Sequence, residues 1–379
     1  MGSLVKEDLS VSFAEVEDPR VCRKRLHPIG EILFLALVGA LLGIESWQGL
    51  ELLGNERIEF IRRFYPYKNG VPSHQTIARV FSLLKPKSFE QFFMVWAAVL
   101  HGPNNGKQIA FDGKTLRGSY DTDSGKKALH ILNACAVESG ICLAQLEVDS
   151  KTNEITTVPE LIDAIDLRGA MVSVDALNTQ KETAEKIIHS KADYTLALKG
   201  NHKILNEQVQ NIFANQDSTS PNNALQTTEK EHGRITTRAY SVALVDKYNL
   251  SQAPEWSGLQ AVGRVQTTTF RDAKDTHKSN ETRYYLLSYS SVETFAKSAR
   301  GHWGIESKLH WSLDVIFGED ASRKRRDHAP RNYSVIRKFG LNIIRTFKGN
   351  LSVPLFHIRM NANTQAFVEL LTNAGFKPI

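Results

Sequence analysis

The segment IAFDGKTLRGS, Ile109–Ser119, joins a short β-branched and aromatic run to an acid, a glycine and two cations. Gln108–Asp112 has the composition of a β-strand, and the Asp-Gly pair that ends it is typical of a tight turn. A carboxylate at a strand end, close to Lys114 and Arg117, can hold a metal ion beside groups that bind phosphate. A strand that simply ends in a solvated turn has the same composition, so this segment needs support from elsewhere in the chain.

A second predicted strand also ends in an acid. Met171–Asp175, MVSVD, is short and apolar enough to be a buried strand. Further strands are predicted at Ala128–Val137, Ile141–Asp149 and Asp193–Leu198. Capping boxes are predicted to open helices at Thr157 and Thr179. Three antiparallel strands followed by two strands with crossover helices predict an α/β protein with a mixed five-stranded sheet, in the ribonuclease-H-like layout.

The regions around this sheet differ in composition. Residues 1–106 are predicted to be all helical, including a helix over Gly30–Leu53, and they end in the linker GPNNG, Gly102–Gly106. The apolar run Ile32–Ile44 is shorter than the roughly 20 residues of a membrane span, so it predicts a buried helix and no membrane insertion. The predicted parts are a helical domain at 1–106, a first core segment at 107–201, a β-rich insertion at 202–290, further core helices at 291–350 and a tail at 351–379.

The net charge of +6 is unevenly spread. Ala321–Ile379 holds eleven Lys and Arg against two acids, which leaves a small net negative charge on the rest of the chain. A basic segment on a near-neutral body favours a polyanion such as DNA, although a solvated helix face has the same composition. The helix expected at Ser73–Leu84 suits either a DNA groove or simple packing. Three cysteines without metal-type spacing favour reduced thiols in a cytoplasmic protein.

A third acid lies in HWGIESKLHWSLDVIF, residues 302–317. Helical spacing places His302, Glu306, His310 and Asp314 on one face and apolar residues on another. This face suits a solvated surface, a zinc site, or a glutamate that binds Mg²⁺ between histidines that contact phosphate. The zinc-hydrolase signature of two histidines flanking an adjacent glutamate base is absent. We therefore favour the magnesium interpretation.

Asp112, Asp175 and Glu306 form the predicted catalytic and metal-binding set. Two carboxylates at the same edge of a sheet repel each other unless a divalent cation lies between them, and oxygen ligands favour Mg²⁺, for which Mn²⁺ can substitute. Two such ions stabilise the attacking and leaving oxygens when a phosphodiester bond is broken. Asp149 is the main rival, as it ends the third strand, and the remaining acidic candidates are Glu154, Asp314, Glu319 and Asp320.

Cations near these acids are predicted to bind DNA phosphates. The predicted set is Lys114, Arg117, Lys199, Arg300, His302, Lys308, Arg323, Lys324, Arg325 and Arg326. For each of them, a solvated cation with no ligand is the alternative. Trp303 and Trp311 flank the glutamate and suit either base stacking or core packing.

Ordered segments over nearly the whole chain, from about Glu17 to Lys348, resemble the H-repeat-type insertion-sequence transposases. These are DDE transposases with a ribonuclease-H-like catalytic core. The segments include IAFDGKTLRGS, SKTNEITTVPEL, VSVDALNTQKETAEKI, YTLALKGN, EHGRITTRAY and GHWGIESKLHWSLDVIFGED. The resemblance implies that Asp112, Asp175 and Glu306 are the first, second and third acid of the family's triad.

The resemblance also implies metal-dependent cleavage of double-stranded DNA at the ends of the element, followed by transfer of the freed strand to target DNA. It further implies that the helical domain at 1–106 binds these ends and that the protein is associated with the nucleoid. Because two ends must be joined, it implies a homodimer on DNA. The wider superfamily often carries Tyr, Arg and Lys around its glutamate, at positions occupied here by Ala299, His302 and Leu313. Two alternatives remain open: a nuclease that cuts without integrating, and a non-catalytic DNA-binding derivative.

Overall fold

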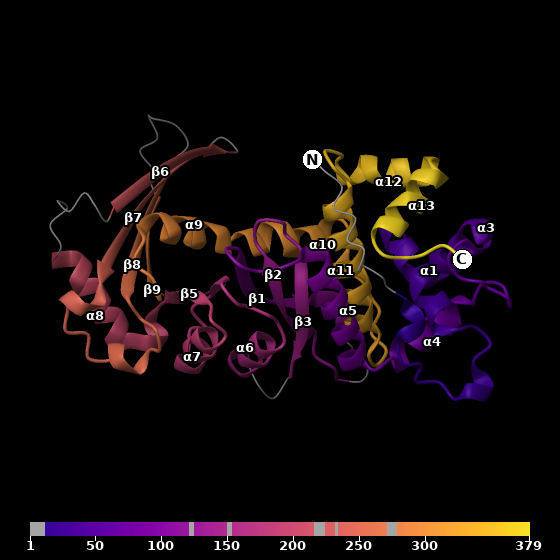
Figure 1. The fold of residues 1–379 in the computed structure, drawn as a ribbon, viewed down its shortest axis with the longest axis horizontal. Coiled ribbons are helices and arrows are strands. Elements are labelled where there is room, and N and C mark those ends of the chain that lie inside the picture. The colour runs from indigo at the N-terminus through magenta and orange to yellow at the C-terminus, as the bar shows by residue number, and fades with distance from the viewer. Residues whose placement is uncertain (1–11, 121–124, 150–153, 216–223, 232–233, 271–278) are drawn as a thin grey trace.

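The computed structural model describes residues 12–120, 125–149, 154–215, 224–231, 234–270 and 279–379, so the start of the predicted helical domain lies outside the described residues. Figure 1 shows an elongated molecule: helices gather at one end, a sheet occupies the middle, and β6 to β9 form the other end. Within the described ranges, no helix is long and apolar enough to cross a membrane.

The described strands form one mixed sheet in the order β3-β2-β1-β4-β5-β9-β8-β7-β6. Pairing is antiparallel between β1 and β2 and between β2 and β3, and parallel from β1 through β4 to β5. The strands are β1 Gln108–Leu116, β2 Leu129–Ala136, β3 Cys142–Val148, β4 Met171–Val174, β5 Asp193–Leu198, β6 Ala224–Glu231, β7 Arg234–Leu244, β8 Ala261–Phe270 and β9 Ser279–Leu287. The mixed α/β class is therefore confirmed.

The prediction that the sheet has only five strands is wrong. The free edge of β5 pairs antiparallel with β9, with Thr195 opposite Leu287, so the β-rich segment extends the same sheet. Nine strands are present among the described residues. The five predicted strands are adjacent to one another within this larger sheet. The sheet extends beyond them because the unpaired backbone groups of an edge strand can pair with a further strand.

Two hydrophobic layers cover the sheet. On one face, Ile109 and Phe111 of β1 belong to a core that includes Leu161 of α6 (Glu154–Asp163) and Ile187 of α7 (Lys181–His189). On the other face, Ala110 belongs to a core shared with the helical end of the molecule. Figure 1 shows α6 and α7 on one side of the central strands and α9 (Val292–His302) on the other. The alternation along β1 explains how one strand packs against both layers.

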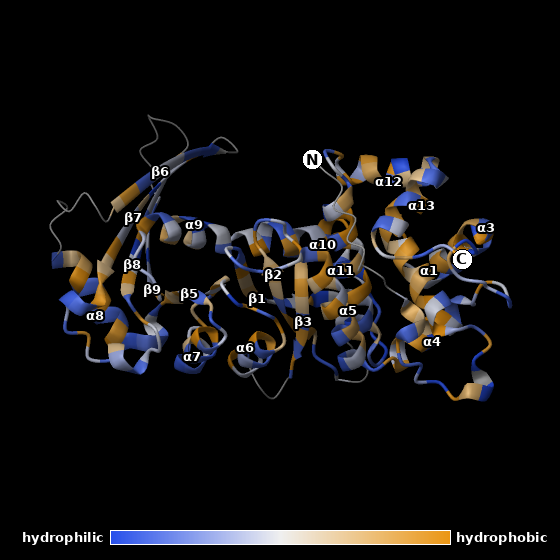
Figure 2. Cartoon of the chain, in the orientation of Figure 1, coloured by the Kyte–Doolittle hydropathy of each residue, from blue (hydrophilic) through white to orange (hydrophobic). Residues whose placement is uncertain are grey.

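The N-terminal helical region is confirmed, and it packs with the C-terminal helices in one core. Every residue of α1 is buried, as the apolar run predicts, and Figure 2 shows hydrophobic residues on this helix. Its helices are α1 Ile29–Leu41, α2 Trp47–Glu56, α3 Ile58–Ile61, α4 His74–Leu83 and α5 Pro86–His101; the C-terminal ones are α11 Ala329–Phe347, α12 Val353–Ala362 and α13 Thr364–Asn373. The predicted single helix over Gly30–Leu53 is wrong, because Gly43 takes a positive φ of 76° and Ser46 caps a new helix.

Replacing Glu90 with alanine is expected to lower the free energy of unfolding by about 1–3 kcal/mol, because Arg331 and Gln145 would lose a buried hydrogen-bond partner. Only Glu147 would remain to pair with Arg331. Glu90 of α5 is fully buried and accepts hydrogen bonds from Arg331 at 2.7 and 2.6 Å and from Gln145 at 2.8 Å. Urea unfolding checks this against Glu59→Ala, whose side chain is 85% exposed. Equal stability of the two variants would contradict the role of this buried ion pair.

Candidate active site

Asp112 and Asp175 are brought together by the register of β1 and β4. The last pair of this parallel ladder is Phe111 with Val174, and each acid is the next residue of its chain. The strand β1 continues to Leu116, however, and there it pairs with β2 alone. The predicted turn after Asp112 is therefore wrong, and Asp112 lies inside a strand at the point where β4 diverges from it.

Gly113 does not form a turn; it leaves room beside the strand for neighbouring side chains. A Cβ atom at this position would lie 2.1 Å from Glu154 Oε1 and 2.5 Å from His130 Nε2. The helix α6 begins at Glu154, earlier than the predicted start at Thr157, which is buried within the helix. The prediction of that helix start is wrong, and the earlier start places the Glu154 carboxylate beside the strand that carries Asp112.

Glu154 is fixed by two polar partners that the sequence did not single out. His130 Nε2 lies 2.5 Å from one carboxylate oxygen of Glu154, and Asn178 donates to the other at 2.6 Å. The backbone N–H of Asn178 also donates to Asp175 Oδ1 at 3.0 Å. Asn178 therefore links Asp175 to Glu154.

Glu306 lies in a π-helical turn, Ile305–His310, between α9 and α10 (Trp311–Val315). Turns of this kind are rare and occur frequently at functional sites. Ile305 and Leu309 are buried in the core while Glu306 is exposed. The predicted continuous α-helix through this segment is wrong, because the wider turn interrupts its spacing.

The charges of four acids meet at Asp112. Burial, together with the negative charges of Asp175, Glu154 and Glu306, raises the pKa of Asp112 to about 7. Burial also raises the pKa of Asp175. Repulsion of this kind is relieved when a divalent cation binds between the carboxylates. The donor set consists of hard oxygens and therefore fits Mg²⁺ or Mn²⁺. In the described ranges, no three His, Cys, Asp or Glu side chains are already close enough to enclose an ion.

The two histidines of the predicted zinc face contact different residues. His302 Nδ1 lies 3.1 Å from Ser173 Oγ, whereas His310 Nδ1 lies 3.6 Å from Asp112 Oδ2. Burial lowers the pKa of His302 to about 4 and that of His310 to about 3, with nearby cations adding to the effect. Both rings are thus neutral at pH 7. Because they contact different residues, their positions do not support a zinc ion bound by both histidines.

Asp149 lies apart from this cluster, although it follows β3 at the same edge of the sheet. The strand β2 separates β3 from β1, and Asp149 is exposed. Asp314 and Asp320 each pair with Lys114, and Glu319 is buried beside Arg337. None of these acids is among the charged groups that contribute most to the raised pKa of Asp112.

Several of the predicted phosphate-binding cations are engaged within the protein. Lys114 is only 8% exposed and donates to Asp314 at 2.8 Å and to Asp320 at 3.0 Å. Lys308 donates to the carbonyl oxygen of Val137, and Arg300 pairs with Glu229. Lys324 donates to the Glu45 carbonyl and lies over the rings of Trp47 and Tyr333, and Arg325 donates to the Gly118 carbonyl and lies over the ring of Tyr120.

The other predicted cations face solvent. Arg117 is 83% exposed and pairs with Asp320, and Arg326 is 76% exposed and pairs with Asp327. Lys199 and Arg323 are exposed, and Lys199 directly follows β5, at the same edge of the sheet as Asp175. Of the predicted cations, these four are thus accessible to solvent.

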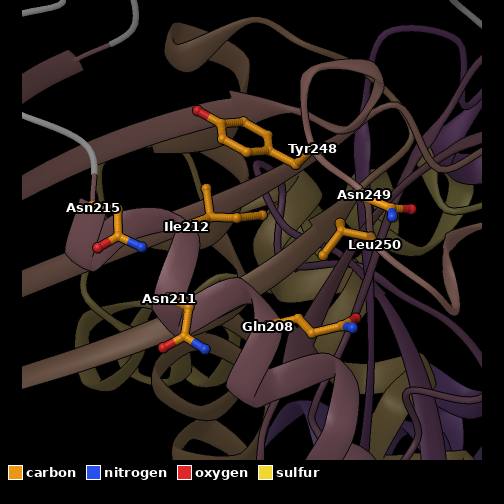
Figure 3. Close-up of a pocket in the computed structure, with 7 residues that line it drawn as sticks. All are labelled: Gln208, Asn211, Ile212, Asn215, Tyr248, Asn249 and Leu250. Atoms are coloured by element: carbon orange, nitrogen blue, oxygen red, sulfur yellow. The ribbon is translucent and has the colours of Figure 1, made fainter.

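A separate hollow of about 290 Å³ lies between α8 (Lys203–Asn215) and the segment that follows β7. Figure 3 shows its lining, which consists of Gln208, Asn211, Ile212, Asn215, Tyr248, Asn249 and Leu250. None of these side chains is charged at neutral pH. The hollow therefore offers neither a carboxylate for a metal ion nor a cation for a phosphate.

The fold and the acidic cluster define a class of α/β protein that gathers carboxylates where its central parallel strands end. Comparison with family models is more specific: a model described as "DDE_Tnp_1-associated" matches residues 11–97, and the "Transposase DDE domain" matches residues 103–343. The second match spans more than half of the chain. The chain belongs to the DDE transposase family, within its H-repeat group, and the resemblance seen in the sequence is confirmed.

Relatives of similar length support this membership. "Putative transposase YncI" of Escherichia coli O157:H7 is 38% identical over 88% of this chain and 86% of its own length. "H repeat-associated putative transposase YhhI" of Escherichia coli (strain K12) is 34% identical over 93% and 95%. A solved structure, a piggyBac transposase synaptic complex with hairpin DNA, aligns with 92% of this chain and 76% of its own, with a TM-score of 0.40 and 11% identity.

Proposed function

We propose that this transposase cleaves DNA phosphodiester bonds and transfers the freed strand, using divalent cations held by Asp112, Asp175 and Glu306. The observation that carries the proposal is the convergence of carboxylate charge on Asp112. The family match supports the reaction class. In this proposal the strands β3-β2-β1-β4-β5 form a ribonuclease-H-like core. The proposed structural divisions of the whole chain are residues 1–106, 107–201, 202–290, 291–350 and 351–379.

The protein's own groups would bind and orient the reactants. Asp112 and Asp175 would present carboxylates from adjacent strands, and Glu306, whose charge raises the pKa of Asp112, would add a third from the π-helical turn. Bound Mg²⁺ or Mn²⁺ neutralises these acids and stabilises negative charge on the attacking and leaving oxygens. Neutral His310, beside Asp112, adds no positive charge that would compete with a cation for the carboxylate.

The proposed substrate is double-stranded DNA, both as the ends of the element and as the target. A DNA partner would place the protein with the nucleoid in the cytoplasm. Joining two ends calls for a homodimer on DNA, and light scattering of the protein with end DNA tests this. A complex that contains a single chain would contradict the dimer.

Two exposed arginines of the basic C-terminal segment are expected to contribute to the salt dependence of DNA binding. Each lost phosphate contact reduces the slope of log affinity against log salt by about 0.9, so Arg323→Ala with Arg326→Ala should reduce it by about two such steps. A matched control is Arg168→Ala, since this exposed arginine precedes β4 and so lies at the opposite end of that strand from Asp175. An unchanged slope in the double variant would contradict the proposed contacts of Arg323 and Arg326 with DNA phosphates.

The metal requirement tests the proposed function itself. Labelled DNA that carries the flanking element end is incubated with the wild-type protein in Mg²⁺, in Mn²⁺ and in EDTA. We expect cleavage in both metals, none in EDTA, and joining of the freed 3′ end to target DNA. Cleavage without joining would favour the nuclease alternative, and binding without any cleavage would favour the DNA-binding one.

A further inference from the structure

Glu154 lies in the acidic cluster although it is no part of the proposed triad. Its Oε1 atom occupies the space that a side chain on Gly113 would fill, at 2.1 Å from the position of a Cβ atom. Gly113 is the neighbour of Asp112 in the chain, so the Glu154 carboxylate lies next to the strand backbone that positions Asp112. A larger residue at position 113 would exclude it.

Two side chains hold the Glu154 carboxylate in this place. His130 bridges from Thr115 Oγ1, 2.8 Å from its Nδ1, to Glu154, 2.5 Å from its Nε2. Asn178 is fully buried, donates its amide N–H to Glu154, and donates its backbone N–H to Asp175. Glu154 is thereby tied to β1 on one side and to the second acid of the cluster on the other.

The amide of Asn178 also has an unused acceptor. Its buried Oδ1 has no hydrogen-bond partner among the described atoms. A buried amide oxygen without a partner costs free energy, so such groups normally find a partner or a ligand. An amide oxygen is also a ligand that hard divalent cations accept. A carboxylate has about four lone-pair sites, so Glu154 retains acceptor capacity beyond its two hydrogen bonds.

We propose that Glu154 is a fourth carboxylate of the metal site, with His130 and Asn178 as residues that position it. The inference rests on the proposed metal-dependent function and adds a ligand to it. A fourth negative charge increases the attraction for a second cation, and the two hydrogen bonds fix the direction from which the carboxylate approaches. Glu154 acts on the cations directly, whereas His130 acts through Glu154.

Mn²⁺ titration followed by electron paramagnetic resonance tests this ligand without relying on cleavage. Glu154→Gln is expected to weaken Mn²⁺ binding by about 10- to 100-fold, the range typical for groups that shape a metal site. Glu160→Gln is the matched control, because Glu160 is an exposed acid on the same helix. In cleavage assays Glu154→Gln should need a correspondingly higher Mg²⁺ concentration for half-maximal rate.

Gly113→Ala provides a second variant, in which no acidic residue is replaced. Its methyl group would displace the Glu154 carboxylate, so it should weaken Mn²⁺ binding as Glu154→Gln does. Wild-type Mn²⁺ affinity in both variants, with Asp112→Asn impaired, would overturn the fourth ligand and leave the triad intact. A wild-type protein that binds no Mn²⁺ would overturn the fourth ligand and the proposed function together.

Discussion

Asp112→Asn is expected to lower the rate of DNA cleavage by about 10³-fold or more, because the cations it helps to hold supply several kcal/mol of transition-state stabilisation. Asparagine keeps the shape of the side chain and removes its charge. The loss should appear in the rate and not in the fold, because the substitution relieves the repulsion from Asp175, Glu154 and Glu306. We expect a melting temperature equal to or above that of the wild type.

Single-turnover cleavage, with the protein in excess over the DNA and above the dissociation constant of the complex, measures this rate. DNA affinity, measured by gel shift in EDTA, should stay close to that of the wild type. Asp166→Asn is the control, because Asp166 is exposed, pairs with Arg168, and lies before β4 rather than after it. A rate within about tenfold of the wild type, equivalent to roughly 1.4 kcal/mol, would show that Asp112 does not hold the cations.

Lys114→Met is expected to lower the free energy of unfolding by about 2–3 kcal/mol, because it removes hydrogen bonds to two charged groups that remain partly buried. The Lys114 ammonium joins β1 to Asp314 of α10 and to Asp320 of the following turn. Its removal should also slow cleavage, since α10 continues from the turn that carries Glu306. DNA affinity should change little.

The measurement also separates two roles for this lysine. Chemical denaturation gives the loss of stability, and a gel shift gives the DNA affinity. Arg117→Gln is the control, since Arg117 is 83% exposed on the same segment and should leave stability within about 0.5 kcal/mol of the wild type. A fall in DNA affinity without a loss of stability would instead support the phosphate contact predicted for Lys114.

The closeness of Asp112 and Asp175 could be predicted, because each follows an apolar run of the kind that forms a buried strand. The carboxyl ends of neighbouring parallel strands meet at one edge of a sheet, so the acids that follow them meet there too. The exact place of Asp112 within β1 could not be predicted in the same way. An Asp-Gly pair has the same composition whether it forms a turn or leaves room for a neighbouring carboxylate, and only the position of Glu154 distinguishes the two.

The remaining errors share a dependence on contacts between distant residues. The pairing of β5 with β9 joins Thr195 to Leu287, and no local pattern encodes that register. The π-helical turn around Glu306 has an ordinary helical sequence. Asp175 offered a weak signal, since an Asp side chain often bonds to the backbone that follows it, and here it accepts from the backbone N–H of Asn178. His130 offered none, because its partner is set by the start of α6.

The measurement that tests the metal site most directly compares single acids on one substrate. Labelled end DNA is incubated in Mg²⁺ with the wild type, Asp175→Asn, Glu306→Gln or Asp149→Asn. Cleavage and DNA binding are measured for each protein. We expect Asp175→Asn and Glu306→Gln to bind DNA without cutting it and Asp149→Asn to cut as the wild type does. Cutting by Glu306→Gln at the wild-type rate, with none by Asp149→Asn, would contradict the proposed site.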